Sequence, residues 1–455
     1  MAMNKKTSLT LKFAEKIVHA DPLSCSEAVM EAKCGLMDYI AVCFGAKRES
    51  GVSKLISIMQ QQGGKEIVPI IGQNSKLSQW QAALVNGYSG HVLDFDDVHS
   101  DVRGHPSTVI LPTLISVVSK ENITGKQFLA AYIIGIEAMA RLGEAIGSKH
   151  YLRGWHNTST LGVIAAAVSA GYLKGFTAKQ IAMLIGFATT QASGLRVHFG
   201  TETKPLHAGL AAQAAIMAVS FVENEISCSE LSLDGELGFF GVYGQGSDFA
   251  ETFLLKNWGE TWKINKPGLW FKIYPFCSAA HHAADAAIEL LSTYNFSQEN
   301  IKEIIITFPP KGDAALIHQH PKNCSQGRFS VEYVVALVLA GQPLTMNNFR
   351  NIGIPINIQK LMKVTRRCYD ASIKPTANAV PRGRFTIVQV LTKDEKSYSV
   401  RVDCPKGAPG NGVSLIELKE KMMNLVNCEE LSEKLFSEIT HLNSSENLKT
   451  LLTLL

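Results

Sequence analysis

Three long stretches of the chain carry apolar residues on every face of the helix that each would form. They are FLAAYIIGIEAMARLGEAI (128–146), TSTLGVIAAAVSAGYLKG (158–175) and LHAGLAAQAAIMAVSFVENE (206–225). A helix that is hydrophobic all round is buried by other helices, and small residues at this density let helix axes pack closely. The sequence therefore predicts that residues 1 to about 265 form a helical body with several enclosed helices.

The composition favours a compact globular protein and excludes two classes of partner. Of the 455 residues, 46% are hydrophobic and 18% are charged, so a large core can form and disorder is disfavoured. The net charge is +4 and the Lys and Arg residues are scattered, so we expect no nucleic-acid partner. The longest apolar run, residues 208–222, is interrupted by Gln213 and is shorter than a membrane span, so we expect no membrane partner.

The cysteines and the N-terminal segment indicate the compartment. Nine widely spaced cysteines without a Cys-x-x-Cys pair are typical of mostly buried thiols in a reducing compartment, not of a disulfide framework or a zinc module. In MAMNKKTSLTLKFAEKIVHA, charged residues at positions 12, 15 and 16 break the apolar run that a signal peptide needs. The segment is more typical of an amphipathic first helix. We expect a cytoplasmic protein.

The pattern changes after residue 265. IKEIIITFPP (301–310) alternates and is β-branched, which predicts a strand, and RFTIVQVLTKDEKSYSVRV (384–402) predicts a hairpin. Glycine and proline residues at 405–412 mark a linker, after which the chain is helical again. The predicted fold is mainly α, with a large all-helical domain (residues 1–268), a smaller α/β lid domain (269–407) and a C-terminal return to the helical domain (408–455).

The segment HVLDFDDVHSDVRGHPS (91–107) holds four carboxylates and three histidines. A metal site is weakly supported, because His99 and His105 are six positions apart across a glycine and no second cluster has metal-ligand spacing. Acid–base chemistry fits better, since a buried Asp94 can orient the His105 imidazole and raise its basicity. We expect the remaining aspartates to cap helices or to face water: Asp96, Asp97 and Asp101.

A second segment, RGWHNTSTLG (153–162), places His156 before a run of good N-cap residues, 157–159. A helix N-terminus binds carboxylates through its free N–H groups, and His156 would stand beside it. The alternative is a partly buried histidine that only bonds to a loop, and the sequence leaves both open.

A third segment, GLRVHFGTETKPLHAG (194–209), places Lys204 at a helix start, where a residue at 201 or 203 can act as the cap. The helix dipole disfavours a cation there unless an anion joins it, which indicates an anionic ligand. An exposed surface lysine is the alternative. Three neighbours are supporting candidates for substrate binding: Arg196, Thr203 and His207.

A fourth segment, KIYPFCSAAHHAAD (272–285), contributes Lys272 as a further binding candidate and two adjacent histidines. Since their side chains would point about 100° apart on a helix, we expect His281 to face the cleft and His282 to pack or face solvent, or the reverse. No Gly-x-Gly-x-x-Gly, Walker, Gly-x-Ser-x-Gly or His-Glu-x-x-His motif occurs, so we expect no cofactor and no metal. The remaining groups suit proton abstraction next to a carboxylate.

These four segments, followed by RFSVEYVVALVL (328–339), occur in order along nearly the whole chain and together resemble the MmgE/PrpD family. That family includes 2-methylcitrate dehydratase, cis-aconitate decarboxylase and iminodisuccinate epimerase. The resemblance implies a large helical domain with an α/β lid, a homodimer, and cofactor-independent proton transfer on small di- or tricarboxylates.

The resemblance to cis-aconitate decarboxylase also implies a set of catalytic residues, although two positions differ. Val98 stands where that enzyme has Thr, with the Asp-to-His interval one residue longer. The segment KGDAALIHQHP (311–321) lacks the lid Tyr, whose space His318 or His320 could fill. The implied catalytic residues are Asp94, His105, His156, Lys204 and His281.

We therefore expect a lyase or isomerase of this family. Dehydration of a 2-methylcitrate-like substrate comes first, because it is the common bacterial assignment in the family. An epimerase like that for iminodisuccinate and a cis-aconitate decarboxylase are the alternatives. Two rivals lie outside this chemistry: a non-catalytic protein that binds a carboxylate metabolite, and a metal-dependent hydratase.

Overall fold

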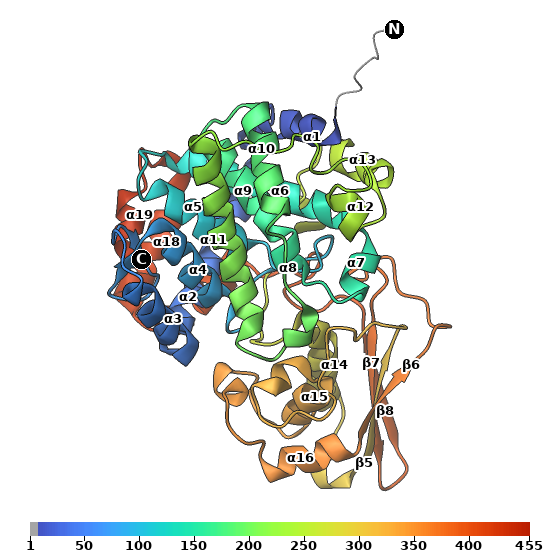
Figure 1. The fold of residues 1–455 in the computed structure, drawn as a ribbon. Helices are drawn as coiled ribbons and strands as arrows, with labels where there is room; N and C mark the ends of the chain where they lie inside the picture. The colour runs from blue at the N-terminus through green and yellow to red at the C-terminus, as the bar shows by residue number, and fades with distance from the viewer. Residues whose placement is uncertain (1–7) are drawn as a thin grey trace.

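The computed structural model describes residues 8–455, with residue 247 described by its backbone alone. It consists of a large helical body and a smaller lid that contains a four-stranded sheet (Figure 1). The predicted mainly-α fold class, with an α/β lid, is confirmed. The predicted amphipathic first helix is confirmed as a helix over Leu9–Val18 that buries Leu9, Phe13 and Ile17. The first seven residues lie outside the described residues, so our interpretation of that part of the segment stays a prediction.

The helical body is formed by the first thirteen α-helices of the described chain and four short strands. Their bounds are α1 (Leu9–Val18), α2 (Ser26–Gly45), α3 (Ser50–Gln61), α4 (Gln79–His91), α5 (Ser107–Val118), α6 (Gly125–Ile146), α7 (Ser148–Leu152), α8 (Asn157–Thr160), α9 (Gly162–Leu173), α10 (Ala178–Thr189), α11 (Thr203–Glu223), α12 (Phe239–Tyr243) and α13 (Ser247–Leu255), with β1 (Val68–Pro69), β2 (Lys76–Leu77), β3 (Val98–His99) and β4 (Leu269–Trp270).

The three stretches predicted to be enclosed are α6, α8–α9 and α11. Helices α6 and α9 are almost wholly buried, whereas α11 is enclosed only in part and leaves residues such as Leu210 exposed. In α9 every residue except Tyr172 is buried. Helix α11 packs on α4, α5 and α9, and a Cβ added at Gly87 would stand 2.8 Å from Cα of Gly209. Glycines at this crossing therefore let α4 and α11 approach closely, as the small-residue content predicted.

Helix α11 is longer than the apolar run from which it was predicted. It spans 21 residues, and by length and composition it could cross a membrane. Of its most apolar 18-residue window, 61% is buried among the described residues of the protein.

The lid contains three helices and a mixed sheet. The helices are α14 (His281–Thr293), α15 (Val331–Leu339) and α16 (Ile356–Lys363), and the strands are β5 (Ile301–Phe308), β6 (Thr365–Tyr369), β7 (Thr386–Thr392) and β8 (Ser397–Val402). The predicted strand is confirmed as β5 and the predicted hairpin as β7 and β8, and α14 packs on that hairpin. Strand β6 was not predicted; it pairs parallel with β5 at the edge of a sheet whose order is β6-β5-β7-β8.

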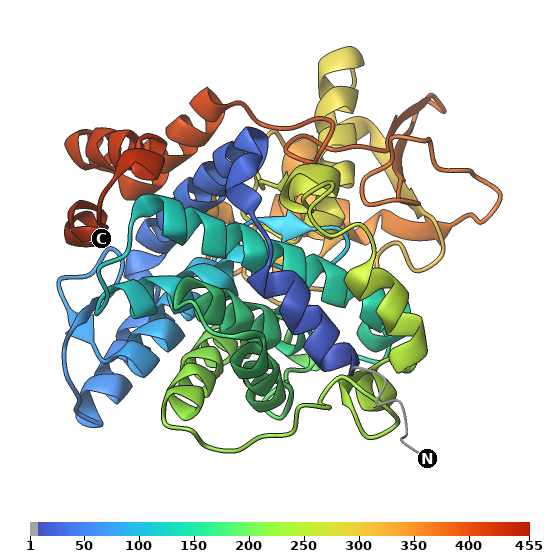
Figure 2. The ribbon, with the colours of Figure 1, turned by 90° about the horizontal axis from the view of Figure 1, so that it is seen from above.

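After the lid the chain returns to the helical body through α17 (Leu415–Val426), α18 (Glu429–Thr440) and α19 (Lys449–Leu454). Helix α17 packs on α2 near the other end of the sequence, and Figure 2 shows these C-terminal helices beside the N-terminal ones. A capping box between Ser414 and Glu417 fixes the start of α17.

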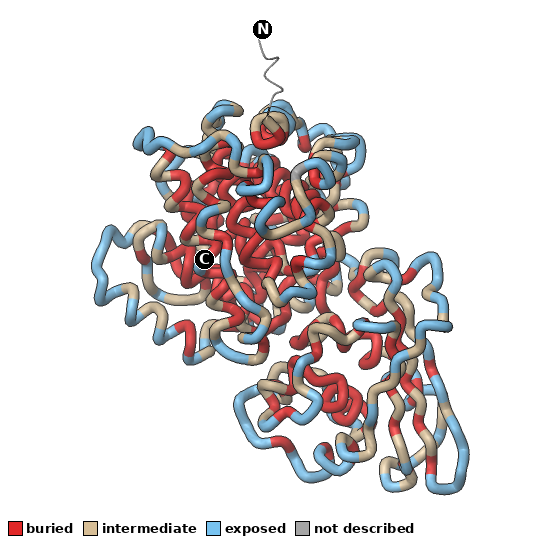
Figure 3. The backbone as a smooth tube through the Cα atoms, turned by 45° about the vertical axis from the view of Figure 1, so that its right-hand side comes forward, coloured by how far each residue is buried: buried red, intermediate tan, exposed pale blue. Residues whose placement is uncertain are grey.

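The molecule has two main hydrophobic cores. One joins buried side chains between residues 9 and 271 with those between 418 and 455, and the other lies between residues 276 and 400 with Phe199 added. Figure 3 shows the two buried regions as separate bodies. Strands β3 and β4 pair antiparallel, which ties the histidine-rich segment to the point where the chain enters the lid.

Candidate active site

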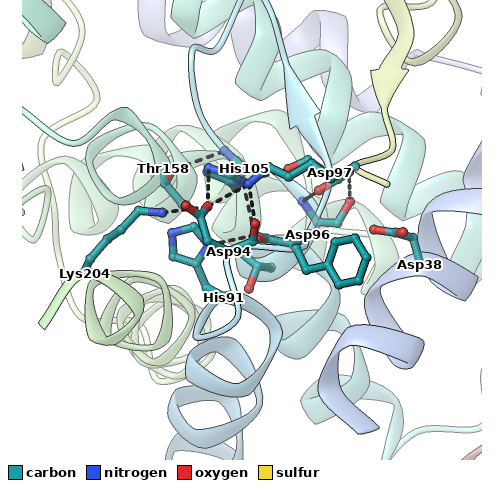
Figure 4. A network of polar contacts seen from close by, with 12 residues as sticks. Asp38, His91, Asp94, Asp96, Asp97, His105, Thr158 and Lys204 are labelled. Atoms are coloured by element: carbon teal, nitrogen blue, oxygen red, sulfur yellow. Dashed lines mark hydrogen bonds and ion pairs between the residues drawn. The ribbon is translucent and has the colours of Figure 1, made fainter. Parts of the chain in front are cut away.

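The loop between α4 and α5 brings two histidines to one carboxylate (Figure 4). Asp94 has a φ of 51°, a left-handed conformation that aspartate tolerates better than most residues. After this turn, Asp96 Oδ2 lies 2.7 Å from His91 Nδ1 and 3.2 Å from His105 Nδ1. The Asp96 carboxylate therefore bridges the two imidazoles.

The expectation that Asp96 caps a helix or faces water is wrong. Its side chain is buried, because the loop folds back and encloses it between His91 and His105. Burial alone would raise the pKa of Asp96, but the charges and hydrogen bonds of these two histidines hold the pKa well below its usual value. Asp96, not Asp94, is thus the carboxylate beside Nδ1 of His105.

The neighbours of His105 define which ring nitrogen carries the proton. Nδ1 lies 2.8 Å from the main-chain oxygen of Asp97 and 3.2 Å from Asp96 Oδ2. Both are acceptors, so Nδ1 carries the hydrogen and Nε2 keeps its lone pair. Burial, against the opposing charge of Asp96, lowers the pKa of His105. His105 is therefore neutral near pH 7, with a basic Nε2.

The other two aspartates of the segment behave differently from each other. Asp97 accepts hydrogen bonds from the N–H and the hydroxyl of Ser107, the first residue of α5. It is not the N-cap, which is Pro106; it is fully buried, and burial raises its pKa well above the usual value. Asp101 pairs with Lys263 at 2.9 Å in a partly exposed position. Neither carboxylate contacts His105 through its side chain.

Asp94 pairs with two lysines from distant parts of the chain. Its Oδ1 lies 3.0 Å from Nζ of Lys204 and 2.7 Å from Nζ of Lys272, and Lys272 also donates to the Asp94 main-chain oxygen at 2.7 Å. Burial would raise the pKa of Asp94, but the two ammonium groups outweigh it and hold the pKa well below its usual value. His105 Nε2 is 3.8 Å from the same oxygen.

Lys204 is the second residue of α11, as predicted, and it is buried. We expected an anion beside this lysine at the helix start, and within the chain that anion is the Asp94 carboxylate. Its ammonium also lies over the rings of Phe199 and Phe329, 5.4 Å and 5.0 Å from their centroids. These contacts hold Lys204 between the helical body and the lid.

His156 and His207 extend the row of imidazoles. Their Nδ1 atoms are 3.1 Å apart, and the His156 ring stacks on that of His91 with centroids 5.8 Å apart. Burial and the nearby cationic groups, including Lys204, hold the pKa of His156 well below its usual value, and burial lowers the pKa of His207 to about 4. Both rings are neutral near pH 7.

The residues predicted to cap a helix after His156 do not cap it. Asn157, Thr158 and Ser159 lie inside the four-residue helix α8, whose N-cap is His156. The Thr158 hydroxyl accepts the N–H of His105 at 3.1 Å, and the Asn157 amide donates to the main-chain oxygen of Val102 at 2.7 Å. These side chains therefore brace the loop that carries His105. Helix α8 has only four residues, so it does not provide the helix N-terminus that was expected to bind a carboxylate.

A cavity of about 370 Å³ lies between the helical body and the lid. His105, His156 and Lys204 line it from the body, and Val98 contributes an apolar patch. Among the described residues its lining contains no Asp or Glu. It contains five lysine or arginine side chains: Arg103, Lys204, Lys311, Arg382 and Arg384.

Arg384 is the most confined cation on the lid side of this cavity. It donates one hydrogen bond, from Nη2 to the main-chain oxygen of Ala279 at 3.3 Å, and its Nε is buried without a partner among the residues described. Among residues 8–455 its one hydrogen-bond partner is thus a main-chain oxygen, not a carboxylate. An anionic ligand in the cavity would supply the missing charge.

Several other predicted residues are not brought to this cavity. Arg196 donates to the main-chain oxygens of Tyr151 and Ala314, so it ties the body to the lid. Thr203 is half-buried, and its N–H donates to the Thr201 hydroxyl. His281 is buried, with Nε2 3.2 Å from the Phe276 oxygen. None of the three lines the cavity.

The remaining candidates also lie outside the lining of the cavity. His282 packs, which is one of the expected arrangements: it is buried, with Nε2 2.8 Å from the Val380 oxygen. His318 and His320 line a separate shallow hollow with Arg367, so neither occupies a place beside His105. Lys272 is enclosed behind Asp94 and supports that carboxylate.

A second cavity, of about 460 Å³, lies on the other side of Lys204. His91 and Asp94 line it from the body, and Arg328 lines it from the lid. Lys204 and Phe329 line both cavities and so form the wall between them.

The loop also contains a set of donor atoms that could hold a metal ion. One ligand atom each from His91, Asp94, Asp96 and His105 lie within 4.8 Å of one another. The spacing in the sequence did not indicate this group. Two ammonium groups already lie against Asp94, and Asp96 already holds both histidines. Three atoms of the group, His91 Nε2, Asp94 Oδ2 and Asp96 Oδ1, are nevertheless buried without a partner among the residues described.

Sequence reasoning missed His91, Asp96 and the lid arginines. His91 and Asp96 stood in the segment that was singled out, but their meeting depends on the left-handed turn at Asp94, which periodicity does not reveal. Arg382 lies just before the predicted hairpin and Arg384 is the hairpin's first residue, and only the packing of the lid on the body brings them to the cavity that His105 lines.

Comparisons with known proteins support the resemblance. The model of the MmgE/PrpD N-terminal domain matches residues 12–252, and that of the MmgE/PrpD C-terminal domain matches residues 274–440. A cis-aconitate decarboxylase of Aspergillus terreus is 24% identical over 406 residues, covering 84% of this chain and 82% of its own. The cis-aconitate decarboxylase of Homo sapiens is 24% identical over 397 residues, with 84% and 80% covered.

Proposed function

The chain belongs to the MmgE/PrpD family, and from that premise we propose that it is a cofactor-independent lyase that moves a proton next to a carboxylate of a small di- or tricarboxylate. Family membership supports chemistry of the dehydratase or decarboxylase type. One observation carries the proposal furthest. His105, whose Nε2 keeps its lone pair, lines a cavity with five lysine or arginine side chains and, among the described residues, no Asp or Glu in its lining.

Dehydration of a 2-methylcitrate-like substrate is the reaction we place first. Arginines bind carboxylates through paired hydrogen bonds, so Arg384 holds one carboxylate of the substrate from the lid. His105 Nε2 then takes the proton from the carbon next to a carboxylate, and the nearby ammonium of Lys204 stabilises the negative charge that develops.

The same histidine can complete the elimination. Once protonated, His105 gives that proton to the departing hydroxyl group, so that a carbon–carbon double bond and water are formed and the charge balances. Because His156 is neutral, its part is a hydrogen bond to the departing oxygen. Asp96 supports this cycle, since an ionised carboxylate at Nδ1 stabilises the imidazolium that forms.

Decarboxylation of cis-aconitate is the second candidate, because the two relatives described above carry that name. In that reaction carbon dioxide leaves first and the carbanion takes a proton from His105, which has to gain that proton from solvent because its resting imidazole is neutral. Val98 lines the cavity where the resemblance expects Thr, which favours dehydration over this alternative. An iminodisuccinate epimerase remains a third candidate of the same chemical class.

The test is to incubate the purified protein with 2-methylcitrate, citrate, cis-aconitate and iminodisuccinate and to identify products by NMR. We expect an unsaturated tricarboxylate and water from a 2-methylcitrate-like substrate. Carbon dioxide release from cis-aconitate would select the decarboxylase instead. Binding of one compound without turnover would support a carboxylate-binding protein and contradict the proposal.

The variant Lys204→Ala separates binding from folding in this assay. We expect it to lose turnover, because the cavity would lose one cation and Asp94 would keep only one of its two ammonium partners, Lys272. Unchanged carboxylate binding and turnover in a folded Lys204→Ala protein would refute the role given to Lys204. A homodimer stays a prediction from the family resemblance, and a cytoplasmic location stays a prediction from the cysteines and the N-terminal segment.

A further inference from the structure

Lys421 reaches from the C-terminal return to the back of the active-site loop. Its ammonium donates hydrogen bonds to Asp38 Oδ1 at 2.6 Å, to the main-chain oxygen of Phe95 at 2.8 Å and to that of Lys272 at 2.9 Å. Its side chain is 9% exposed, and its Nζ lies 3.9 Å from the centroid of the Phe95 ring.

The two main-chain oxygens belong to the two segments that meet at Asp94. Phe95 separates Asp94 from Asp96, and Lys272 pairs with Asp94 itself. An ammonium group has three N–H donors, and here each has an acceptor. One side chain of α17 therefore joins the loop that carries both aspartates to the segment that carries Lys272.

We propose that Lys421 is a positioning residue of the active site, which sets the separation of the Asp94 loop from Lys272 and thereby the placement of Asp96 and His105. The proposal rests on the proposed function, because it assigns to Lys421 an effect on the reaction of that same site. Such a brace supports the turn at Asp94, whose left-handed conformation has some cost even for aspartate.

A purely structural role, in which Lys421 only docks α17, is the alternative. Docking has its own basis, because α17 buries Leu418, Met422, Leu425 and Val426 against the body. Loss of one ammonium group leaves this apolar contact intact. The two roles therefore differ in what they predict for the reaction and for the loop.

The first experiment compares Lys421→Met with Lys419→Met on the same helix. Lys419 pairs with Glu433 on the surface between α17 and α18 and makes no contact with the loop, so it is the matched control. A displacement of catalytic groups by about 1 Å costs on the order of 100-fold in rate. We expect kcat to fall by about that factor in Lys421→Met, with KM within a few-fold, and no change in Lys419→Met.

Chemical rescue distinguishes positioning from damage to the fold. A cavity of about 570 Å³, lined by Phe95, Lys272 and Lys421, gives a small amine access to the space that Lys421→Ala would leave. We expect ethylammonium to restore kcat of Lys421→Ala in a saturable manner, at least tenfold, and to leave Lys419→Ala unchanged. A folded Lys421→Ala protein with full kcat, or one that no amine rescues, would overturn the proposal.

Hydrogen exchange without substrate keeps the test independent of the proposed function. In Lys421→Met we expect the amides of residues 94–98 to exchange at least tenfold faster, while the amides of α2 keep their protection. Equal exchange in Lys421→Met and the wild type would contradict positioning. If the wild type converts none of the carboxylates but the loop responds as expected, the proposed function fails and the inference about Lys421 stands.

Discussion

The two walls of the interdomain cavity carry the same sign of charge but neutralise it differently. On the body wall, Lys204 lies 3.0 Å from the Asp94 carboxylate. On the lid wall, Arg384 contacts a main-chain oxygen and, among the residues described, no carboxylate. A buried charge is costly unless it is paired. The body therefore holds its reactive groups in a finished arrangement, and the lid presents charge that a substrate carboxylate can neutralise.

The largest effect should come from removing the base on the body wall. In His105→Gln the proton acceptor is lost, and general acid–base catalysis contributes about 100- to 10,000-fold, so we expect kcat to fall within that range. Steady-state kinetics and a substrate-binding titration measure the two effects separately. Normal binding with normal kcat would show that His105 is not the base.

The contrast between the walls also predicts opposite effects on stability. Asp94→Asn leaves two buried ammonium groups without their carboxylate, and breaking such a pair costs about 3–5 kcal/mol. Arg384→Met removes a cation that has no carboxylate partner, so its free energy of unfolding should stay the same or rise. Urea denaturation of both variants measures the difference, and equal losses in the two would break the comparison.

Recognition should weaken when the lid loses its charge. A hydrogen bond to a charged group is worth about 1.5–3 kcal/mol, so we expect KM of Arg384→Gln to rise by one to two orders of magnitude with kcat within a few-fold. Arg196→Gln is the control on the same domain junction, since Arg196 bonds to main-chain oxygens and lies outside the cavity. A loss confined to kcat would place Arg384 in the chemistry instead.

Buried histidines on both sides should make stability depend on pH in the same way. Burial lowers the pKa of His91 in the body and of His282 in the lid to about 3. Below pH 6.5 the unfolded chain binds protons that the folded one does not, so stability is full above pH 6.5 and falls as the pH drops toward 3, by about 1.4 kcal/mol per pH unit for each histidine.

The variant His282→Gln isolates one of these two contributions without touching the cavity. Between pH 6 and pH 4 we expect the free energy of unfolding to depend less steeply on pH, by about 1.4 kcal/mol per pH unit, which corresponds to the uptake of one proton fewer on unfolding. Denaturation at a series of pH values measures it. An unchanged slope would mean that His282 is protonated in the folded protein.

The smallest effect should follow removal of metal ions. Because Lys204 and Lys272 supply positive charge at Asp94, we expect dialysis against a chelator to leave kcat unchanged. Metal analysis of the protein before and after dialysis is the companion measurement. Loss of activity that a divalent cation restores would assign the His91–Asp94–Asp96–His105 group to a metal and support a metal-dependent hydratase.

Much of the fold could be predicted because its signals are local. Apolar residues on all faces marked α6, α9 and α11, and alternation marked β5 and the β7–β8 hairpin. Strand β6 escaped because Arg366 and Arg367 interrupt its alternation, and its place at the sheet edge comes from parallel pairing with β5, a contact between distant residues.

The site was less predictable, since it depends on contacts between distant segments. Lys204 was found because a cation at a helix start requires an anion, but the sequence could not identify Asp94 as that anion. Asp96 was assigned to a helix cap or to solvent, because only the turn at Asp94 encloses it. His281 was chosen from the resemblance, and in the folded chain its Nε2 meets a main-chain oxygen.

The most direct test of the central claim is proton NMR of the chelator-treated protein in D₂O with its best carboxylate substrate. The account predicts that the wild type introduces solvent deuterium at a carbon next to a carboxylate, in the substrate or the product. It predicts that His105→Gln does so at least 100-fold more slowly while still binding the substrate. Turnover without deuterium at such a carbon, or exchange that is independent of His105, would contradict proton transfer by this site.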